Sequence, residues 1–276
     1  MPRIAAANVE HCRMCAVIEL HADSDGFTAE CTLDPTAGGR VATLRVDGTD
    51  VIVGPDPKLP VTGWGSYPMV PWAGRVRRGS FRIDGVEHHL PINFEQHAIH
   101  GTGFEQPWCG KVLDGLRASM HCELAWVFGG EARQQFTLDG RSLTCTLAVR
   151  AGRVPMPVTV GWHPWYVKPE RVDLRFERMY VRDDDYIPTG QTIAPRRPPW
   201  DDCFTDPLST PRLWIGDLAI SITSDCDHWV VYDMPEHATC VEPQSGPPDA
   251  FNIGGATRLE PGQELRRTMT IRWARA

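Results

Sequence analysis

The stretch FTLDGRSLTCTLAV, residues 136 to 149, carries the pattern that decides the fold class. On both sides of its Asp139-Gly140 pair, every second residue is large and apolar. A period of two places successive side chains on opposite faces of a strand, and Asp-Gly suits the positive φ angles of a tight hairpin turn. The stretch therefore predicts an antiparallel β-hairpin with one face on a core.

The same pattern recurs along the whole chain. Alternating runs cover residues 120–128, 218–222 and 269–273, and further Asp-Gly pairs begin at positions 25, 47, 84 and 114. Amphipathic helical periodicity is absent, and no shift in composition divides the chain. We therefore expect an all-β protein of antiparallel sheets with a single domain over residues 1–276. Residues 182–216 are rich in Asp, Pro and Arg, which predicts a long loop of the kind that often builds a site.

Bulk properties exclude several classes of partner. The formal net charge of the 276 residues is −7, which argues against nucleic acid and anionic membranes. A continuous apolar run of about 18 residues, as a membrane span requires, does not occur. The nine cysteines are scattered and odd in number, which favours a reduced, cytoplasmic protein. Cys12 and Cys15 have the spacing of a redox or zinc motif, but without a second half they are interpreted as two ordinary thiols.

Two segments of unusual composition carry candidate catalytic residues. In VEPQSGPPDAFN, residues 241–252, Glu242 is followed by three prolines, so the backbone is stiff and cannot be helical. In VGWHPWY, residues 160–166, His163 stands among aromatic residues. Histidine transfers protons near neutral pH, and a carboxylate complements it. Each has a simpler interpretation, namely a proline-rich surface turn and a hydrogen-bonded structural histidine.

Together with PWAGR, residues 71–75, and AIHG, residues 98–101, these segments resemble the aldose 1-epimerase (galactose mutarotase) family. The matching blocks spread over residues 70 to 252, and the chain is similar to the shorter, bacterial-type branch. The resemblance implies a galactose mutarotase-like β-supersandwich of large antiparallel sheets. It also implies opening and reclosure of a sugar ring by proton transfer, with neither metal nor other cofactor.

The resemblance assigns roles residue by residue. His163 matches the general acid and Glu242 the general base, and the two should face one concave pocket about one pyranose ring apart. We expect the pKa of Glu242 to be raised toward neutrality if aromatic neighbours exclude water. The remaining matches would hold the sugar: Arg75, His100, either Asp201 or Asp202, and the ring of Trp162. Trp72 and Trp200 are further candidate platforms, and core packing competes with this role for all three tryptophans.

The sequence also departs from the family pattern. Gly161-Trp162 precedes His163 where larger members carry Asn, and Gly74 precedes Arg75 where Asn is common. A hexose-6-phosphate mutarotase therefore stays open, with Arg182, Arg196 and Arg197 as a possible phosphate clamp. So does a non-catalytic carbohydrate-binding protein of the same fold. In each case the expected partner is a small sugar, and the protein is a monomer or homodimer.

Overall fold

The computed structural model describes residues 16–276, and the Cys12–Cys15 motif lies outside this range. Strands dominate, as the alternating sequence predicts, and the fold is all-β. Within the described range the helical elements are one short α-helix and two 3₁₀ turns: α1 (Ala250–Ile253), η1 (Arg77–Gly79) and η2 (Gly103–Glu105). None of these could span a bilayer, so residues 16–276 hold no candidate membrane helix.

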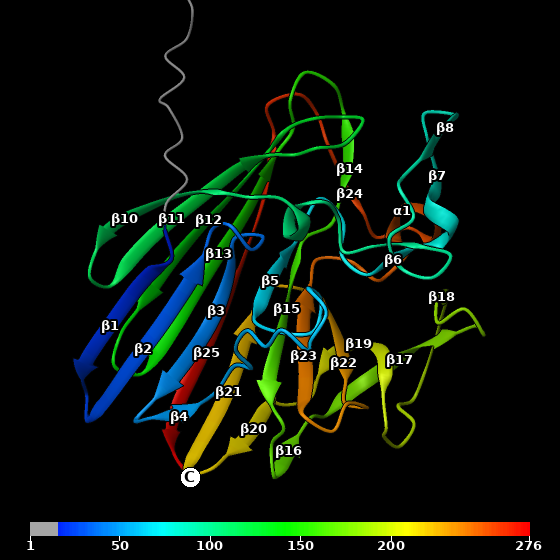
Figure 1. Cartoon of the computed structure of the whole chain (residues 1–276). Helices are drawn as coiled ribbons and strands as arrows, with labels where there is room; N and C mark the ends of the chain where they lie inside the picture. Colours follow the sequence, from blue (N-terminus) through cyan, green and yellow to red (C-terminus); the bar gives the residue numbers. More distant parts are fainter. Residues whose placement is uncertain (1–15) are drawn as a thin grey trace, which may run out of the picture.

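The larger of two main sheets has eleven strands, and its neighbouring strands pair antiparallel (Figure 1). In spatial order they are β1 (Ile18–Ser24), β2 (Phe27–Asp34), β3 (Arg40–Val46), β5 (Ser66–Met69), β15 (Gly161–Val167), β23 (Ala238–Gln244), β22 (His228–Tyr232), β19 (Asp201–Pro207), β17 (Phe176–Arg182) and β18 (Pro188–Ile193), with β4 (Thr49–Asp50) beside β3.

The second main sheet has eight strands. They are β10 (Cys109–Asp114), β11 (Arg117–Glu123), β12 (Glu131–Leu138), β13 (Ser142–Arg150), β25 (Glu264–Arg275), β21 (Leu218–Ser224), β20 (Arg212–Ile215) and β16 (Arg171–Asp173). Three two-stranded ribbons complete the fold: β6 (Arg75–Val76) with β9 (Ala98–Ile99), β7 (Ser80–Ile83) with β8 (Val86–His89), and β14 (Met156–Val158) with β24 (Thr257–Leu259).

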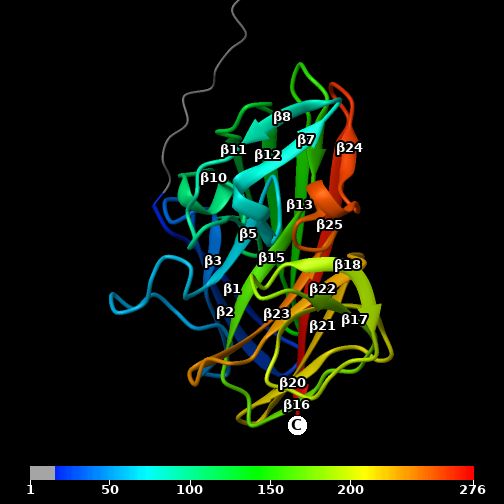
Figure 2. The ribbon, with the colours of Figure 1, turned by 90° about the vertical axis from the view of Figure 1, so that its right-hand side faces the viewer.

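The two main sheets pack face to face (Figures 1 and 2). Between them lies one hydrophobic cluster that draws from both sheets, with Leu44, Trp162 and Phe204 on one side and Leu143 and Ile271 on the other. All five side chains are inaccessible to solvent. The alternation that the sequence shows is thus the alternation between this core and the outer face of each sheet.

The Asp-Gly pairs form hairpin turns as expected. The pairs at 25, 47 and 84 join β1 to β2, β3 to β4 and β7 to β8, and in each both residues have a positive φ. This is the requirement of the two-residue turn that matches strand twist. The hairpin around Asp139 is also confirmed, because Leu138 pairs with Leu143.

The expectation of a long loop over residues 182–216 is wrong. This region forms β18, β19 and β20, and β19 is an interior strand of the larger sheet. The polar residues of β19 led to the wrong prediction, because Asp201 and Asp202 line a cavity where a strand that faces a core would carry apolar residues. Pro188 is tolerated because it begins β18, which is an edge strand.

Candidate active site

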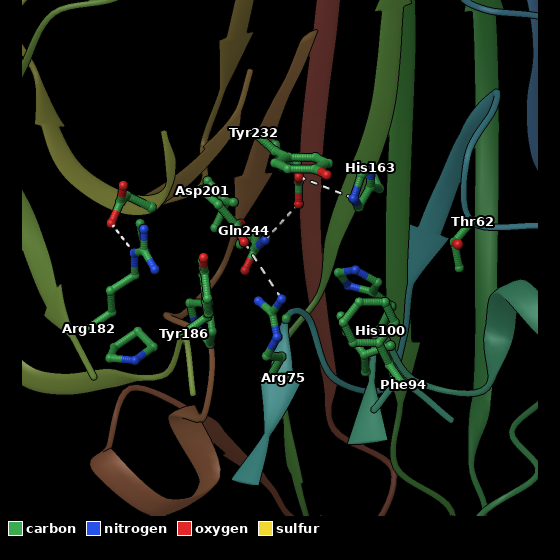
Figure 3. A pocket seen from close by; sticks show the side chains of 18 of the residues that line it. Thr62, Arg75, Phe94, His100, His163, Arg182, Tyr186, Asp201, Tyr232 and Gln244 are labelled. Carbon is green, nitrogen blue, oxygen red and sulfur yellow. Dashed lines mark hydrogen bonds and ion pairs between the residues drawn. The ribbon is translucent and has the colours of Figure 1, made fainter. Parts of the chain in front are cut away.

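A cavity of about 280 Å³ lies on the face of the eleven-stranded sheet that points away from the core (Figure 3). Its floor is built by consecutive strands from β5 to β18. Its walls come from residues 60–63, the Arg75 and His100 segments, and the turn that follows β17. The cavity therefore collects residues that are far apart in the sequence.

His163 and Glu242 meet in the floor of this cavity. They stand on the adjacent strands β15 and β23, and the Nε2 atom of His163 lies 3.2 Å from Oε1 of Glu242. The expected separation of one pyranose ring is therefore wrong. Contact suits the chemistry, however, because the ring oxygen and the hydroxyl oxygen of a cyclic sugar are both bonded to C1. Two groups side by side can address both oxygens of that carbon.

Aromatic rings hold the imidazole of His163 in one orientation. Tyr67, its cross-strand partner on β5, stacks on the imidazole with centroids 4.8 Å apart. Trp165, two residues along the same strand, stacks with centroids 5.2 Å apart, and His237 stacks on Trp165 at 5.5 Å. A ring held between two others keeps its nitrogen directed at Glu242.

Burial sets the protonation of the pair. His163 is 6% exposed and Glu242 is 1% exposed. Burial disfavours charge on both groups. It lowers the pKa of His163 to about 3. It also raises the pKa of Glu242 well above its ordinary value, and the nearby Asp201 carboxylate adds to this effect. Burial therefore favours the state in which the pair holds one proton, on Glu242, and the pKa of Glu242 shifts in the direction that the sequence predicts.

A buried guanidinium lies behind the stacked rings. Arg40 is inaccessible to solvent and donates hydrogen bonds to the carbonyl oxygens of Val61 (2.8 Å) and Trp64 (2.9 Å). Its Cζ atom lies 5.2 Å from the centroid of the Tyr67 ring. Arg40 thus fixes the 60–65 wall, and its positive charge also contributes to the lowered pKa of His163.

Arg75, His100 and Asp201 surround the pair formed by His163 and Glu242. Asp201 Oδ2 lies 3.6 Å from Arg75 Nη2, and both side chains are less than one-fifth exposed. Arg75 on β6 pairs with Ile99 on β9, which places His100 beside it. His100 is buried, and desolvation followed by the proximity of His163 and Arg75 lowers its pKa well below the ordinary value. It is therefore a neutral imidazole that can donate one hydrogen bond.

The two neighbouring aspartates have different partners. Asp202 is 8% exposed, and its Oδ1 accepts a hydrogen bond of 2.7 Å from Arg182 Nε. Within residues 16–276, the Asp201 carboxylate makes the longer contact with Arg75. Both line the cavity, but Asp201 has more of its acceptor capacity available to a ligand.

The proline-rich segment is braced against the Arg75 segment. Around Glu242 it is the strand β23, but the expectation that it cannot be helical is wrong at its end, where α1 begins at Ala250. Asp249 donates its amide hydrogen to the carbonyl oxygen of Arg75 (2.6 Å) and accepts one at Oδ1 from the amide of Arg77 (2.9 Å). Asn252 Nδ2 donates to the same carboxylate at 2.7 Å. Gly74 has a φ of 70°, and a Cβ atom at this position would lie 2.7 Å from Pro248 Cβ, so glycine lets the Arg75 segment pack against the proline-rich segment.

Trp162 does not line the cavity, so the expected platform is wrong. It points from β15 into the core between the sheets and is inaccessible to solvent. Neighbouring residues of a strand point to opposite faces, and His163 takes the cavity face. Trp72 and Trp200 are also buried in hydrophobic clusters. Near His100, Asn93 Oδ1 accepts a hydrogen bond from the amide of Ile99, and Gln96 Nε2 donates one to Asp185.

Several cavity residues were missed by sequence reasoning. Trp165 and Gln244 each stand two residues from a catalytic candidate on the same strand, so the period of two could have identified them. Gln244 Nε2 donates to Oε2 of Glu242 at 3.1 Å. Tyr186 and Tyr232 come from other strands and turns, and only the sheet order brings them here.

One group of residues within 16–276 has donor atoms close enough for a metal ion. His163, Cys240 and Glu242 each offer one atom, and these atoms lie within 4.8 Å of one another. Burial raises the pKa of the Cys240 thiol well above its ordinary value. Because a metal requires the thiolate, the donor set fits proton transfer between His163 and Glu242 better than metal binding.

Comparison with known proteins places this cavity in a family. The chain matches the family model described as aldose 1-epimerase over residues 17–272. The uncharacterized protein YihR of Escherichia coli (strain K12) is 25% identical over 279 residues, which cover 86% of this chain and 88% of YihR. The galactose mutarotase of Rattus norvegicus is 29% identical over 132 residues, which cover 45% of this chain and 38% of the mutarotase. The match to the uncharacterized E. coli protein YphB covers 53% of that protein. The chain therefore spans about half of the length of YphB and less than half of the length of the rat mutarotase.

Solved structures share the fold. An aldose epimerase homologue from C. elegans superposes with a TM-score of 0.79 and 16% identity, over 95% of this chain and all of that one. A galactose mutarotase-like protein from Clostridium acetobutylicum superposes with a TM-score of 0.79 and 16% identity, over 94% and 99% of the two chains. The family model covers every strand that forms the cavity, and the chain belongs to the aldose 1-epimerase family.

Proposed function

We propose that the protein is an aldose 1-epimerase that interconverts the α and β anomers of a free hexose. The observation that carries the proposal is the contact between His163 and Glu242 in the floor of the cavity. One acid and one base in contact can serve two oxygens of a single carbon. Family membership supports the reaction class.

The reaction consists of ring opening by paired proton transfers, one bond rotation, and ring closure by the reverse transfers. When the sugar binds, the single proton of the pair first passes from Glu242 to His163 across their 3.2 Å contact. Glu242 then takes the proton of the C1 hydroxyl while His163 donates its proton to the ring oxygen, and the bond between C1 and that oxygen breaks. The C1 aldehyde turns about the C1–C2 bond, and the two transfers run in reverse on the other face. After ring opening the proton is on Glu242 and His163 is neutral, which is the state that burial favours.

The groups around the pair would hold the sugar. Arg75 presents a fork of donors, Asp201 an acceptor, and the neutral His100 a single donor. A donor near the ring oxygen would stabilise the negative charge that grows there as the ring opens. The stacked rings of Tyr67 and Trp165 supply apolar surface beside His163.

Charge pairing favours a neutral sugar over a hexose 6-phosphate. The arginines that line the cavity in the described chain are Arg75, which lies against Asp201, and Arg182, which bonds Asp202. The loop arginines 196 and 197, candidates for a phosphate clamp, are absent from its lining. A phosphate would therefore meet guanidinium groups that already have carboxylate partners.

Polarimetry on freshly dissolved α-D-glucose and α-D-galactose tests the proposal. The protein should accelerate the change in rotation, and His163→Ala should reduce kcat by about 10²- to 10⁴-fold. His121→Ala is the matched control, because His121 is exposed on the other sheet, and it should retain the activity.

Two other results would redirect the assignment. Acceleration with glucose 6-phosphate but with neither free hexose would indicate a phosphosugar mutarotase. Binding of sugar without acceleration, unchanged by Glu242→Gln, would indicate a carbohydrate-binding protein.

A further inference from the structure

Glu242 has a second partner besides His163. Nε2 of Gln244 donates a hydrogen bond of 3.1 Å to Oε2 of Glu242, while His163 Nε2 lies 3.2 Å from Oε1 (Figure 3). Residues 242 and 244 of β23 share one face of the sheet, because side chains alternate along a strand. Each oxygen of the carboxyl group therefore has its own partner, and the proposed proton transfers use only the partner at Oε1.

The side chain of Gln244 is enclosed by its neighbours. Its cross-strand partner on β15 is Gly161, where a Cβ atom would lie 3.0 Å from Gln244 Cγ and 2.7 Å from the carbonyl oxygen of Pro243. Its partner on β22 is His228, whose Nε2 lies 3.2 Å from the hydroxyl of Tyr180. Gln244 is inaccessible to solvent. A glycine on the adjacent strand thus provides the space that the glutamine occupies.

One end of the Gln244 amide has no partner. Within residues 16–276, its Oε1 atom is buried and accepts no hydrogen bond. The two ends of an amide exchange places when it turns by 180°, so either end can face Glu242 while the other end stays unpaired. The two orientations therefore differ mainly in what they offer to Glu242, a donor or an acceptor.

Glu242 needs both kinds of partner in the proposed reaction. Its carboxyl group alternates between an ionised form, which only accepts hydrogen bonds, and an acid form, which also donates one. A donor serves the ionised form, and an acceptor serves the acid form when the proton is on Oε2. A cationic partner would favour the ionised form alone, so a neutral amide suits a group that changes its charge in every cycle.

From this arrangement we infer that Gln244 is a positioning residue for Glu242. It holds the carboxyl group with Oε1 toward His163, as a donor to the ionised form and, after a half-turn of its amide, as an acceptor from the acid form. Gln244 itself gains and loses no proton. The inference rests on the proposed function and adds to it a residue that acts through the base.

The titration of Glu242 reports this contact. Burial and then Asp201 raise the pKa of Glu242, whereas the hydrogen bond from Gln244 lowers it. The other titratable or charged side chains that face the carboxyl group are His163 on β15, Tyr67 on β5, Cys203 on β19, Tyr232 on β22, Cys240 on β23 and Arg75 on β6. A substitution of Gln244 leaves all of them in place.

The kinetic test compares Gln244→Met with the wild type across a pH series, on the hexose that the wild type turns over fastest. Methionine has a similar length but no amide. The variant should lower kcat about tenfold and leave KM within about twofold. The basic limb of its kcat/KM should move to higher pH, because the hydrogen bond to the ionised form is the stronger one and its loss dominates.

Infrared spectroscopy tests the acid form without any sugar. The carbonyl stretch of protonated Glu242 is the band that disappears in Glu242→Gln. In Gln244→Met this band should move to higher wavenumber, because the acid has lost its hydrogen-bond partner, and it should persist to higher pH. Gln244→Asn, whose amide is one methylene shorter, should change both measurements in the same direction and replaces Gln244→Met if that variant does not fold. Gln135→Met, the same change at an exposed position on β12, should leave both measurements unchanged.

Three results would overturn the role of Gln244 while the proposed function stands. A rise in KM with the limb and the band unchanged would show that Gln244 binds the sugar itself. A fall in kcat with the limb and the band unchanged would show a structural effect alone, and equal shifts in Gln135→Met would remove the link to Glu242. If the wild type turns over no sugar, the proposed function fails; the band then supports the pairing of Gln244 with Glu242 by moving, or refutes it by staying in place.

Discussion

The Nε2 atom of His163 and the Oε1 atom of Glu242 lie 3.2 Å apart on neighbouring strands, with both side chains almost fully buried. At this distance the pair behaves as one titrating unit. It carries one proton over a wide range of pH, because burial lowers the pKa of the imidazole and raises that of the carboxyl.

The pH dependence of kcat/KM should reflect the shared proton. The wild-type value should fall as the pH rises through the raised pKa of Glu242, since the pair then has no acid. On the acid side it should stay level until the pH approaches the His163 pKa of about 3. In His163→Gln the residual activity should instead rise with pH, because only the ionised Glu242 can act. Initial rates across a pH series check both slopes, and an acid limb at the ordinary histidine value would contradict them.

Glu242→Gln should change how stability depends on pH. The folded protein holds the Glu242 proton more tightly than the unfolded chain, so its contribution is fully present below the ordinary pKa and is lost as the pH rises through the raised one. The loss has a slope of about 1.4 kcal/mol per pH unit within that window. The variant lacks this loss, so its Tm relative to wild type should increase with pH. Glu123→Gln, at an exposed position, should give a curve of Tm against pH that runs parallel to the wild-type curve. A parallel curve for Glu242→Gln would contradict the raised pKa of Glu242.

Arg40→Met should destabilise the wall formed by residues 60–65 and should raise the pKa of His163. It removes the hydrogen bonds to Val61 and Trp64, and a hydrogen bond from a charged group contributes about 1.5–3 kcal/mol. It also removes a positive charge that lowers the pKa of His163, so the acid limb of kcat/KM should move upward in pH. Arg40→Lys retains the charge and should move the limb less. Chemical denaturation and pH profiles test the two effects separately, and identical limbs in both variants would rule out the charge effect.

The two aspartates should respond differently to substitution. Asp201→Asn should raise KM for hexoses by about tenfold, because it weakens a charge-assisted hydrogen bond to the sugar. Asp202→Asn breaks the buried contact with Arg182 and should lower the unfolding free energy by about 1–3 kcal/mol, with a smaller change in hexose KM. Thermal denaturation and saturation kinetics on both variants give the comparison. If Asp202→Asn raised the hexose KM more than Asp201→Asn, Asp202 would be the residue that binds the sugar.

Much of the fold could be predicted because alternation and Asp-Gly turns are local signals. The hairpin around Asp139 and the all-β class follow from them directly. The strand β19 was missed because a strand with a cavity on one face lacks the apolar alternation of a strand with a core. Organisation as a single domain, the oligomeric state and a cytoplasmic location stay predictions.

The site was partly predictable for the same reason. His163, Glu242, Arg75, His100 and the two aspartates lie in short motifs and line the cavity. Trp162 failed because adjacency in sequence was taken for adjacency in space, although neighbours on a strand face opposite ways. Tyr67 and Arg40 reach His163 only through the pairing of β5 with β15 and the loop that Arg40 holds, and neither relation is visible in a local motif.

The burial of His163 and Glu242 has a consequence for where the protons of the proposed reaction come from. The proton that the carboxylate removes at ring opening returns at ring closure, and the imidazole recovers the one it gave. A complete cycle thus ends with the same protons on the same atoms, and none has to enter from the surrounding buffer. A water-poor floor, which would slow an enzyme that must exchange protons with solvent, places no such restriction on this one.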